Sequence, residues 1–261
     1  MDSKRFSLEG KVALITGGSR GIGKASALAF AEAGADVVVS SRKQADLDLV
    51  ADEIKAKNRK GLAIAAHVAK LEDQKKLVDQ VVKKFGRIDI LFNNAGTNPY
   101  PGTLLEAEEW AWDTTMNVNL KGQFFLAQRV AKVMKEKGGG KIINVSSIYG
   151  SRGSNEEEHP AVAYNPSKFA VEGLTKTLAA KLARYKIYVN CIAPGFFKTD
   201  MMAHLFKPEM KPILDLTVGA IPLKMYGEED DVKGLAVFLA SRASNYVTGG
   251  IFPVDGGLSA S

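Results

Sequence analysis

Tyr164 and Lys168 stand four residues apart in the segment "AVAYNPSKFAV". At the start of a helix, this spacing places the phenol and the ammonium on one face, about one turn apart. A free tyrosine has a pKa of about 10, which is too high for efficient proton transfer at neutral pH. A neighbouring ammonium favours the phenolate, so the pair is a candidate for moving a proton. An amphipathic helix with one core aromatic and one solvated lysine would show the same spacing.

A glycine-rich segment, "TGGSRGIG" (16–23), is the second place where chemistry is expected. It lies between an apolar run typical of a strand and an alanine-rich run with helical spacing. Glycines there allow a tight turn, let a ligand approach the backbone, and aim the first N–H groups of a helix at an anion. Strand, turn and helix in this order predict a dinucleotide site. The residues predicted to contact the cofactor are Gly17, Ser19, Arg20, Gly21, Ile22 and Gly23.

The end of the second expected strand, "VVVSSRK", indicates which dinucleotide binds. An NAD site usually presents an acidic residue there to the ribose hydroxyls, whereas an NADP site supplies a cation for the 2′-phosphate. Here Ser41 and Arg42 take that place, and no acid follows until Asp46. Arginine suits a phosphate because its planar fork donates two charge-assisted hydrogen bonds. The sequence therefore predicts NADP(H) in preference to NAD(H).

Short β-branched runs that alternate with longer helical patterns must position these residues. Apolar runs on both faces, each followed by a helix, are typical of a parallel sheet covered by helices. We expect an α/β fold: a single doubly wound Rossmann domain over 1–261, with about seven parallel strands and helices on both faces. The expected strands lie at about 11–16, 36–41, 61–68, 88–94, 141–147, 187–195 and 249–257.

The segment 197–229 breaks this alternation. It holds three prolines and four methionines, and it is predicted to be a mobile apolar lid over a site or, alternatively, a surface excursion with no role.

Composition excludes several other classes of protein. The chain has 261 residues, a formal charge of +6 and one cysteine, Cys191, so no internal disulfide is expected. No run reaches the roughly 18 apolar residues of a membrane helix, and "MDSKRFSLEGK" lacks the apolar core of a signal peptide. The sequence contains no basic run interleaved with aromatic residues, the pattern that would indicate nucleic-acid binding. We expect a cytoplasmic enzyme with no membrane or nucleic-acid partner and no metal.

Together these segments resemble the short-chain dehydrogenase/reductase family over nearly the whole chain. The motifs in family order are "TGGSRGIG" (16–23), "NNAG" (93–96), "MNVNLKG" (116–122), "INVSS" (143–147), "YNPSK" (164–168), "APGFFKT" (193–199) and "VDGG" (254–257). The resemblance implies hydride transfer between a nicotinamide and a ketone or secondary alcohol. It also implies a homotetramer, built through the helices near 108–136 and 161–185 and the last strand.

By this resemblance, Asn119, Ser147, Tyr164 and Lys168 would form the catalytic group. Tyr164 would be the general acid in reduction and the base in oxidation, and Ser147 would hold the substrate oxygen. Lys168 would contact the nicotinamide ribose and favour the phenolate, and Asn119 would support a proton-relay water. The further residues implied at the cofactor are Asn93, Asn94, Ala95, Gly96, Pro194, Gly195 and Thr199.

Two departures from the family pattern stand out. His67 and Val68 occupy the place of an aspartate and valine that would meet the adenine. The segment "NEEEH" (155–159) lengthens the loop before Tyr164, either as a solvated acidic loop or as a rim that selects polar substrates. The remaining histidines, His159 and His204, show no metal-ligand spacing.

Three substrate classes stay open: sugar acids and polyols, apolar ketones such as those of carbonyl reductases, and 3-oxoacyl thioesters. The methionine-rich lid favours apolar substrates and the acidic rim favours polar ones. The alternative to an enzyme is a catalytically silent protein that senses NADP. The intact catalytic group argues against it.

Overall fold

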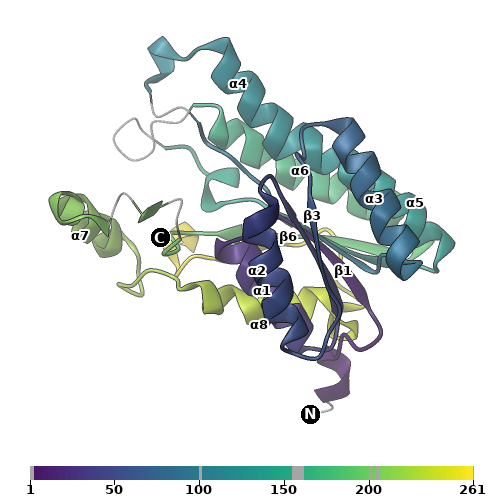
Figure 1. Cartoon of the computed structure of the whole chain (residues 1–261). Coiled ribbons are helices and arrows are strands. Elements are labelled where there is room, and N and C mark those ends of the chain that lie inside the picture. Colours follow the sequence, from purple (N-terminus) through teal and green to yellow (C-terminus); the bar gives the residue numbers. More distant parts are fainter. Residues whose placement is uncertain (1–2, 100–101, 155–161, 200–201, 204–205, 261) are drawn as a thin grey trace.

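The computed structural model describes residues 3–99, 102–154, 162–199, 202–203 and 206–260. Over these residues seven strands form one sheet in the order β3-β2-β1-β4-β5-β6-β7, and every neighbouring pair is parallel. The predicted doubly wound α/β fold is therefore confirmed (Figure 1). The strands are β1 (Val12–Thr16), β2 (Asp36–Ser41), β3 (Gly61–Ala65), β4 (Ile90–Asn93), β5 (Gly140–Val145), β6 (Ile187–Pro194) and β7 (Ile251–Val254).

Helices cover both faces of the sheet, with α1, α2 and α8 on one side and α3, α5 and α6 on the other (Figure 1). The α-helices of the described residues are α1 (Gly21–Glu32), α2 (Gln44–Lys55), α3 (Leu71–Phe85), α4 (Glu109–Met116), α5 (Gln123–Glu136), α6 (Tyr164–Leu182), α7 (Lys211–Ala220) and α8 (Lys233–Ala240). None of them is long and apolar enough to cross a membrane.

Alternation along the strands creates two separate cores. In β1, Ala13 and Ile15 join the core beneath α1, α2 and α8, while Val12 and Leu14 join the core beneath α3, α5 and α6. Successive side chains of a strand point to opposite faces, so a strand between two helical layers must be apolar throughout. All five residues of β1 are buried for this reason.

The strand order reverses between β1 and β4. In sheets of this kind, ligands bind outside the carboxyl ends of the strands at the reversal, because the following loops diverge there. The glycine turn follows β1 and Asn94 follows β4, so the fold brings the predicted cofactor segments to this crevice.

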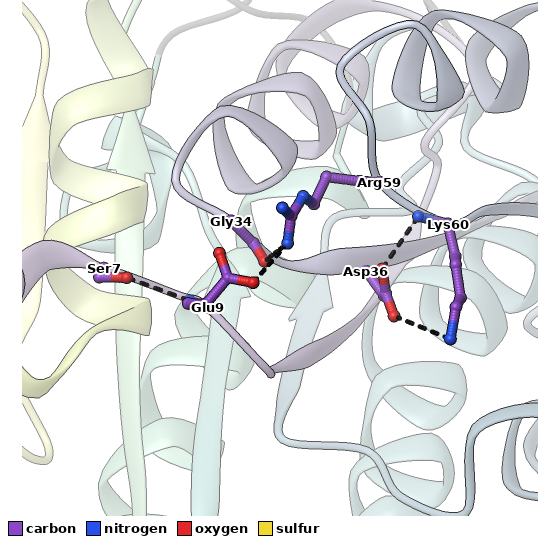
Figure 2. A network of polar contacts seen from close by, with 6 residues as sticks. All are labelled: Ser7, Glu9, Gly34, Asp36, Arg59 and Lys60. Atoms are coloured by element: carbon purple, nitrogen blue, oxygen red, sulfur yellow. Dashed lines mark hydrogen bonds and ion pairs between the residues drawn. The ribbon is translucent and has the colours of Figure 1, made fainter.

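A polar network holds the opposite end of the sheet (Figure 2). Arg59 lies just before β3, and its Nη1 donates to Glu9 Oε1 at 2.7 Å and to the Gly34 carbonyl at 3.0 Å. The backbone N–H of Lys60 donates to Asp36 Oδ1 at 2.9 Å. These bonds tie the N-terminal segment, the turn before β2 and the start of β3 together, away from the crevice.

The break in the alternation predicted at 197–229 is an excursion between β6 and α8. Phe197 and Gly227 pair as an isolated parallel bridge, which closes the excursion at its base. Between them α7 has no buried residue, and Figure 1 shows it standing away from the sheet. Residues 200–201 and 204–205 of this segment lie outside the described residues.

Candidate active site

The turn between β1 and α1 is built on close backbone approach. Gly17 and Gly21 have φ angles of +64° and +57°, in the left-handed region that favours glycine. At Gly23, a Cβ atom would overlap the Gly17 carbonyl oxygen and the Asn94 amide. The first turn of α1 carries no acidic side chain of its own, so its N–H groups can face an anion. The Glu229 carboxylate lies nearby, since a Cβ atom on Gly21 would be 3.9 Å from its Oε1. This cradle fits a dinucleotide pyrophosphate.

Thr16 and Asn94 lock this turn onto the end of β4. The Oγ1 of Thr16 accepts from the backbone N–H groups of Asn94 and Ala95, at 3.1 Å and 3.2 Å. In return, Nδ2 of Asn94 donates to the carbonyls of Thr16 and Gly17, at 3.2 Å and 3.1 Å. The predicted residues Gly17, Asn94, Ala95 and, next in the chain, Gly96 therefore lie together.

The end of β2 presents cations and no carboxylate. Arg42 and Lys43 are exposed, and neither forms a hydrogen bond or ion pair with another described residue. Gly18 donates its N–H to the Ser40 carbonyl at 3.2 Å, which keeps the glycine turn beside this strand end. The two side chains are thus available to a phosphate placed at the turn.

His67 lies beyond the end of β3, in a short loop that α3 holds. Its backbone N–H donates to Asp73 Oδ2 at 3.0 Å, and its Nδ1 accepts from the Ala69 N–H at 3.2 Å. The imidazole therefore helps to shape its own loop, and the Asp73 carboxylate of α3 holds the backbone of that loop.

Tyr164 is the first residue of α6, and Lys168 follows one turn later on the same face. The Lys168 Nζ lies 5.4 Å from the centroid of the Tyr164 ring. Lys168 is only 3% exposed, and its Nζ donates to the Val145 carbonyl at the end of β5, at 3.0 Å. Burial of an ammonium costs free energy, which hydrogen bonds only partly offset. Lys168 therefore differs from a lysine on the solvated face of a helix, which keeps its charge in water.

Two adjacent serines at the end of β5 have different surroundings. Ser147 is 7% exposed, and its Oγ accepts from the Tyr149 N–H at 3.3 Å. The Oγ of Ser146 lies 3.1 Å from the Lys168 carbonyl and 3.1 Å from Glu172 Oε1, which fixes α6 against β5. Burial raises the pKa of Glu172. Ser147 thus lies beside the predicted site, whereas Ser146 belongs to the support behind it.

Asn119 sits in a π-helical turn, Asn117–Gly122, between α4 and α5. It is fully buried, and its Nδ2 donates to the Thr97 carbonyl and to Ser167 Oγ, both at 3.0 Å. Its Oδ1 accepts from the Thr97 N–H at 2.8 Å. A Cβ atom on Gly96 would lie 3.6 Å from both Asn119 Oδ1 and Lys168 Nζ, so both side chains approach Gly96.

Tyr164 packs against an apolar cluster. The cluster residues Ile148, Tyr149, Ile221 and Leu258 are buried, and Tyr164 and Phe196 pack against them. Ile221 comes directly after α7, so the end of α7 joins the apolar cluster against which Tyr164 packs.

The segment after β6 completes the crevice. Gly195 donates its N–H to the Val254 carbonyl at 2.9 Å, directly after the Pro194–Val254 register pair. A Cβ on Gly21 would lie 3.6 Å from Thr199, so this segment reaches the glycine turn. Thr199 and Lys198 line an open cavity of about 640 Å³ together with Ala203, Phe206, Glu228, Glu229 and Asp230.

The structure thus brings the predicted segments to one edge of the sheet. The Asn93 side chain is an exception, because it is buried and its Nδ2 donates to Asn144 Oδ1 at 3.1 Å. The segment "NEEEH" (155–159) lies outside the described residues, and so does His204. Sequence reasoning missed Thr16, Thr97 and Ser167. Thr16 and Ser167 lie inside the quoted motifs, next to predicted residues, whereas nothing in the sequence marks Thr97.

Fold and site together define a dinucleotide-binding α/β protein, and known proteins agree. The sequence model of the family described as "Enoyl-(Acyl carrier protein) reductase" matches residues 17–259. A 3-oxoacyl-[acyl-carrier-protein] reductase, FabG, of Thermotoga maritima is 41% identical over 96% of this chain and 98% of its own length. Dehydrogenase/reductase SDR family member 4 of Homo sapiens is 38% identical over 98% of this chain and 90% of its own length.

A solved structure gives the same result. A gluconate 5-dehydrogenase from Burkholderia cenocepacia, in complex with NADP and tartrate, superposes with a TM-score of 0.92 at 35% identity, covering 100% of both chains. The chain belongs to the short-chain dehydrogenase/reductase family, and it is a nicotinamide-dependent oxidoreductase of that family.

Proposed function

We propose that this enzyme uses NADP(H) to interconvert a ketone and a secondary alcohol, with Asn119, Ser147, Tyr164 and Lys168 as its catalytic group. The placement of Lys168 carries the proposal: a buried ammonium is held by one backbone bond and lies 5.4 Å from the ring centroid of Tyr164. A lysine placed only by helix amphipathicity would lie in solvent, whereas Lys168 is buried beside the end of β5.

Each residue has a role that its position supports. When bound, the nicotinamide supplies or accepts the hydride. The Tyr164 hydroxyl gives a proton to the carbonyl oxygen in reduction and takes it back in oxidation, and the Lys168 ammonium stabilises the phenolate. The Ser147 hydroxyl donates a hydrogen bond to the same oxygen, in the manner of an oxyanion hole. Asn119 hydrogen-bonds to Thr97 and to Ser167. It thereby fixes the start of α6, which carries Lys168.

The residues proposed at the cofactor follow the crevice from the glycine turn to the excursion. Those from the turn and from the ends of β2 and β3 are Gly17, Ser19, Arg20, Gly21, Ile22, Gly23, Ser41, Arg42, His67 and Val68. Those nearer the nicotinamide are Asn94, Ala95, Gly96, Tyr164, Lys168, Pro194, Gly195 and Thr199.

Replacement of Tyr164 by phenylalanine tests the catalytic proposal. Tyr164→Phe removes the transferable proton and keeps the ring that packs on the apolar cluster, so we expect turnover to fall by at least about a hundredfold. NADPH should still raise the melting temperature as it does in the wild type. A variant that keeps its turnover would contradict the assignment. A wild type that binds NADPH and reduces no ketone would instead support the silent cofactor sensor.

Cofactor preference rests on the strand end that carries Ser41 and Arg42. The double change Ser41→Asp with Arg42→Leu places a carboxylate where the 2′-phosphate of NADP would lie and removes its cation. We expect the ratio of kcat/KM for NADPH to that for NADH to fall by at least about tenfold. An unchanged ratio would refute the preference for NADP(H).

The three substrate classes all stay open, because one relative is named for 3-oxoacyl-[acyl-carrier-protein] and a solved structure is named for gluconate. The apolar cluster around Tyr164 supports an apolar ketone. A panel of an aromatic diketone, 5-ketogluconate and acetoacetyl thioester, assayed with NADPH and NADH, would separate the three classes.

We also propose a cytoplasmic homotetramer. Trp110 and Trp112 on α4 and Phe169 on α6 are between 45% and 50% exposed, and exposed apolar side chains on packed neighbouring helices favour an interaction surface. These helices are the ones expected at a subunit interface, and Cys191 is a free thiol compatible with a reducing compartment. Light scattering that gives the mass of one chain would refute the assembly.

A further inference from the structure

Gln74 joins two segments of the crevice that are far apart in sequence. It lies in α3 and is fully buried. Its Nε2 donates to the Val68 carbonyl at 2.5 Å and to the Gly122 carbonyl at 2.9 Å. Val68 belongs to the loop after β3, and Gly122 ends the π-helical turn that carries Asn119. The Gln74 amide group therefore uses one hydrogen for the Val68 carbonyl and the other for the Gly122 carbonyl.

The two segments also touch directly. A Cβ atom on Gly122 would lie 2.8 Å from the Val68 carbonyl oxygen, closer than a side chain allows. Glycine at this position lets the two backbones pack together, and Gln74 then fixes their spacing. A displacement of Val68 must therefore move either the amide or the turn, because a buried carbonyl that loses its donor is destabilised.

On its other side, the turn reaches the catalytic group. Asn119 lies three residues before Gly122, and it donates to Ser167 Oγ at 3.0 Å. The Ser167 hydroxyl in turn donates to the Tyr164 carbonyl at 2.6 Å. An unbroken series of contacts thus leads from Val68 through Gln74 and the turn to Tyr164.

We propose that Gln74 is a positioning residue that couples occupancy of the adenine half of the cofactor cleft to the placement of Asn119. The inference rests on the proposed function, because it takes the loop at Val68 as the adenine contact. Adenine against this loop fixes the Val68 carbonyl, and Gln74 passes the constraint to the turn. Asn119 and Lys168 are then held in place beside Gly96, where the nicotinamide ribose would bind.

Asp73 provides a matched control. It is the neighbour of Gln74 on α3, and it holds the same loop by accepting from the His67 N–H at 3.0 Å. It makes no hydrogen bond to the turn 117–122. A substitution at Asp73 therefore loosens the loop and leaves the link to Asn119 intact.

The experiment splits the cofactor into 2′,5′-ADP and reduced nicotinamide mononucleotide and measures their binding by calorimetry, separately and together. In the wild type, saturation with 2′,5′-ADP should lower the Kd of the mononucleotide by about three- to tenfold, and the reverse order should give the same factor. In Gln74→Met this factor should fall to about one, while each half still binds alone. Asp73→Ala should weaken binding of 2′,5′-ADP and keep the factor.

The outcomes separate this inference from the proposed function. Halves that bind independently in the wild type, or a factor that is unchanged in Gln74→Met, would overturn the coupling and leave the cofactor site standing. A wild type that binds no 2′,5′-ADP would overturn the coupling and the proposed NADP site together. If Gln74→Met does not fold, Gln74→Glu at pH 8 repeats the test, since it keeps the length of the side chain and loses the amide donors.

Discussion

At the scale of single residues, Gly23 shows how much the crevice depends on one missing side chain. Its backbone is helical, so no φ angle demands glycine there. A Cβ atom would nevertheless overlap the Gly17 carbonyl and the Asn94 amide, which both belong to the proposed cofactor cradle. Overpacking of this kind costs about 1–3 kcal/mol and displaces the neighbours. Gly23→Ala should therefore weaken NADPH binding by at least about tenfold in a fluorescence titration, and it should also lower the melting temperature.

Gly234, in α8, is the control for this prediction. It is exposed, and a Cβ atom there would meet nothing within 4 Å. Gly234→Ala should leave NADPH binding unchanged and stabilise the fold by up to about 1 kcal/mol, because alanine loses less entropy in a helix. Unchanged NADPH binding in Gly23→Ala would show that the turn does not form the cofactor cradle.

Residues that carry chemistry were easier to find from the sequence than residues that support them. Tyr164, Lys168 and the glycine turn stand out because they belong to motifs that follow one another in family order along the chain. Gln74 and Thr97 act through amide and backbone groups that depend on tertiary neighbours, and no local pattern marks such contacts. The expectation for Cys191 was packing: it is buried, and burial, followed by the nearby Glu172 carboxylate, raises its thiol pKa to about 12.

At the scale of elements, the helical run from 109 to 136 contains a feature that periodicity does not reveal. The expected long helix is interrupted by the π-helical turn Asn117–Gly122, which presents Asn119 to Thr97 and Ser167. Insertions of this kind cluster at functional sites, because they redirect one side chain without ending the helix. The amino-acid pattern shows only continued helix, since the cause lies in partners 22 and 48 residues away.

The excursion between β6 and α8 yields a prediction about substrate affinity. The Tyr226 hydroxyl donates to the Leu214 carbonyl in α7 at 2.9 Å, and its ring lies 5.2 Å from Phe206. Burial, and then the charge of Asp215, raise the pKa of Tyr226, so the hydroxyl keeps its donor hydrogen at neutral pH. Tyr226→Phe removes one hydrogen bond worth about 1 kcal/mol and keeps the ring contact. If the excursion is the substrate lid, the KM for the carbonyl substrate should rise by about three- to tenfold.

Tyr246→Phe is the matched control, because Tyr246 is fully exposed and forms no hydrogen bond with another described residue. Cofactor affinity, measured by titration, should be unchanged in both variants. A substrate KM that is the same in Tyr226→Phe and the wild type would count against the lid.

At the scale of the whole molecule, the parallel sheet explains why a scattered set of residues meets. Every strand runs in the same direction, so the loops after β1, β2, β4, β5 and β6 all leave at one edge. This arrangement was predictable, because the alternation of strand and helix patterns leaves few topologies. The expectation of one domain over 1–261 stays a prediction, as does the assembly. Distances such as that between Lys168 and Tyr164 required the structure, since they depend on how α6 packs on β5.

Lys141, in β5, makes the stability of the whole fold depend on pH. It is 8% exposed, its Nζ donates to Ser244 Oγ at 3.0 Å, and it lies 4.0 Å from the centroid of the Tyr188 ring. It forms no ion pair with a described carboxylate. Burial therefore lowers its pKa from 10.5 to about 8.

The direction of the pH effect follows from proton binding. Between about pH 8 and pH 10.5 the unfolded chain holds a proton on Lys141 that the folded chain has released. The contribution of Lys141 to the free energy of unfolding therefore becomes more favourable to the folded state as pH rises through this window. Below pH 8 the ammonium is charged in the folded protein, and its burial lowers the free energy of unfolding by the full amount. Over the whole window the contribution is at most about 3 kcal/mol, and partial solvent access reduces it.

Lys141→Met should remove this contribution, because the thioether fills similar volume and does not titrate. Urea unfolding at pH 7.5 and pH 10 should show a smaller rise, or a larger fall, in the free energy of unfolding for the variant than for the wild type. Lys132→Met, at an exposed lysine without a partner among the described residues, should follow the wild type, because this side chain lies in water in the folded protein. Equal pH dependence in Lys141→Met and the wild type would mean that the ammonium of Lys141 reaches water in the folded protein.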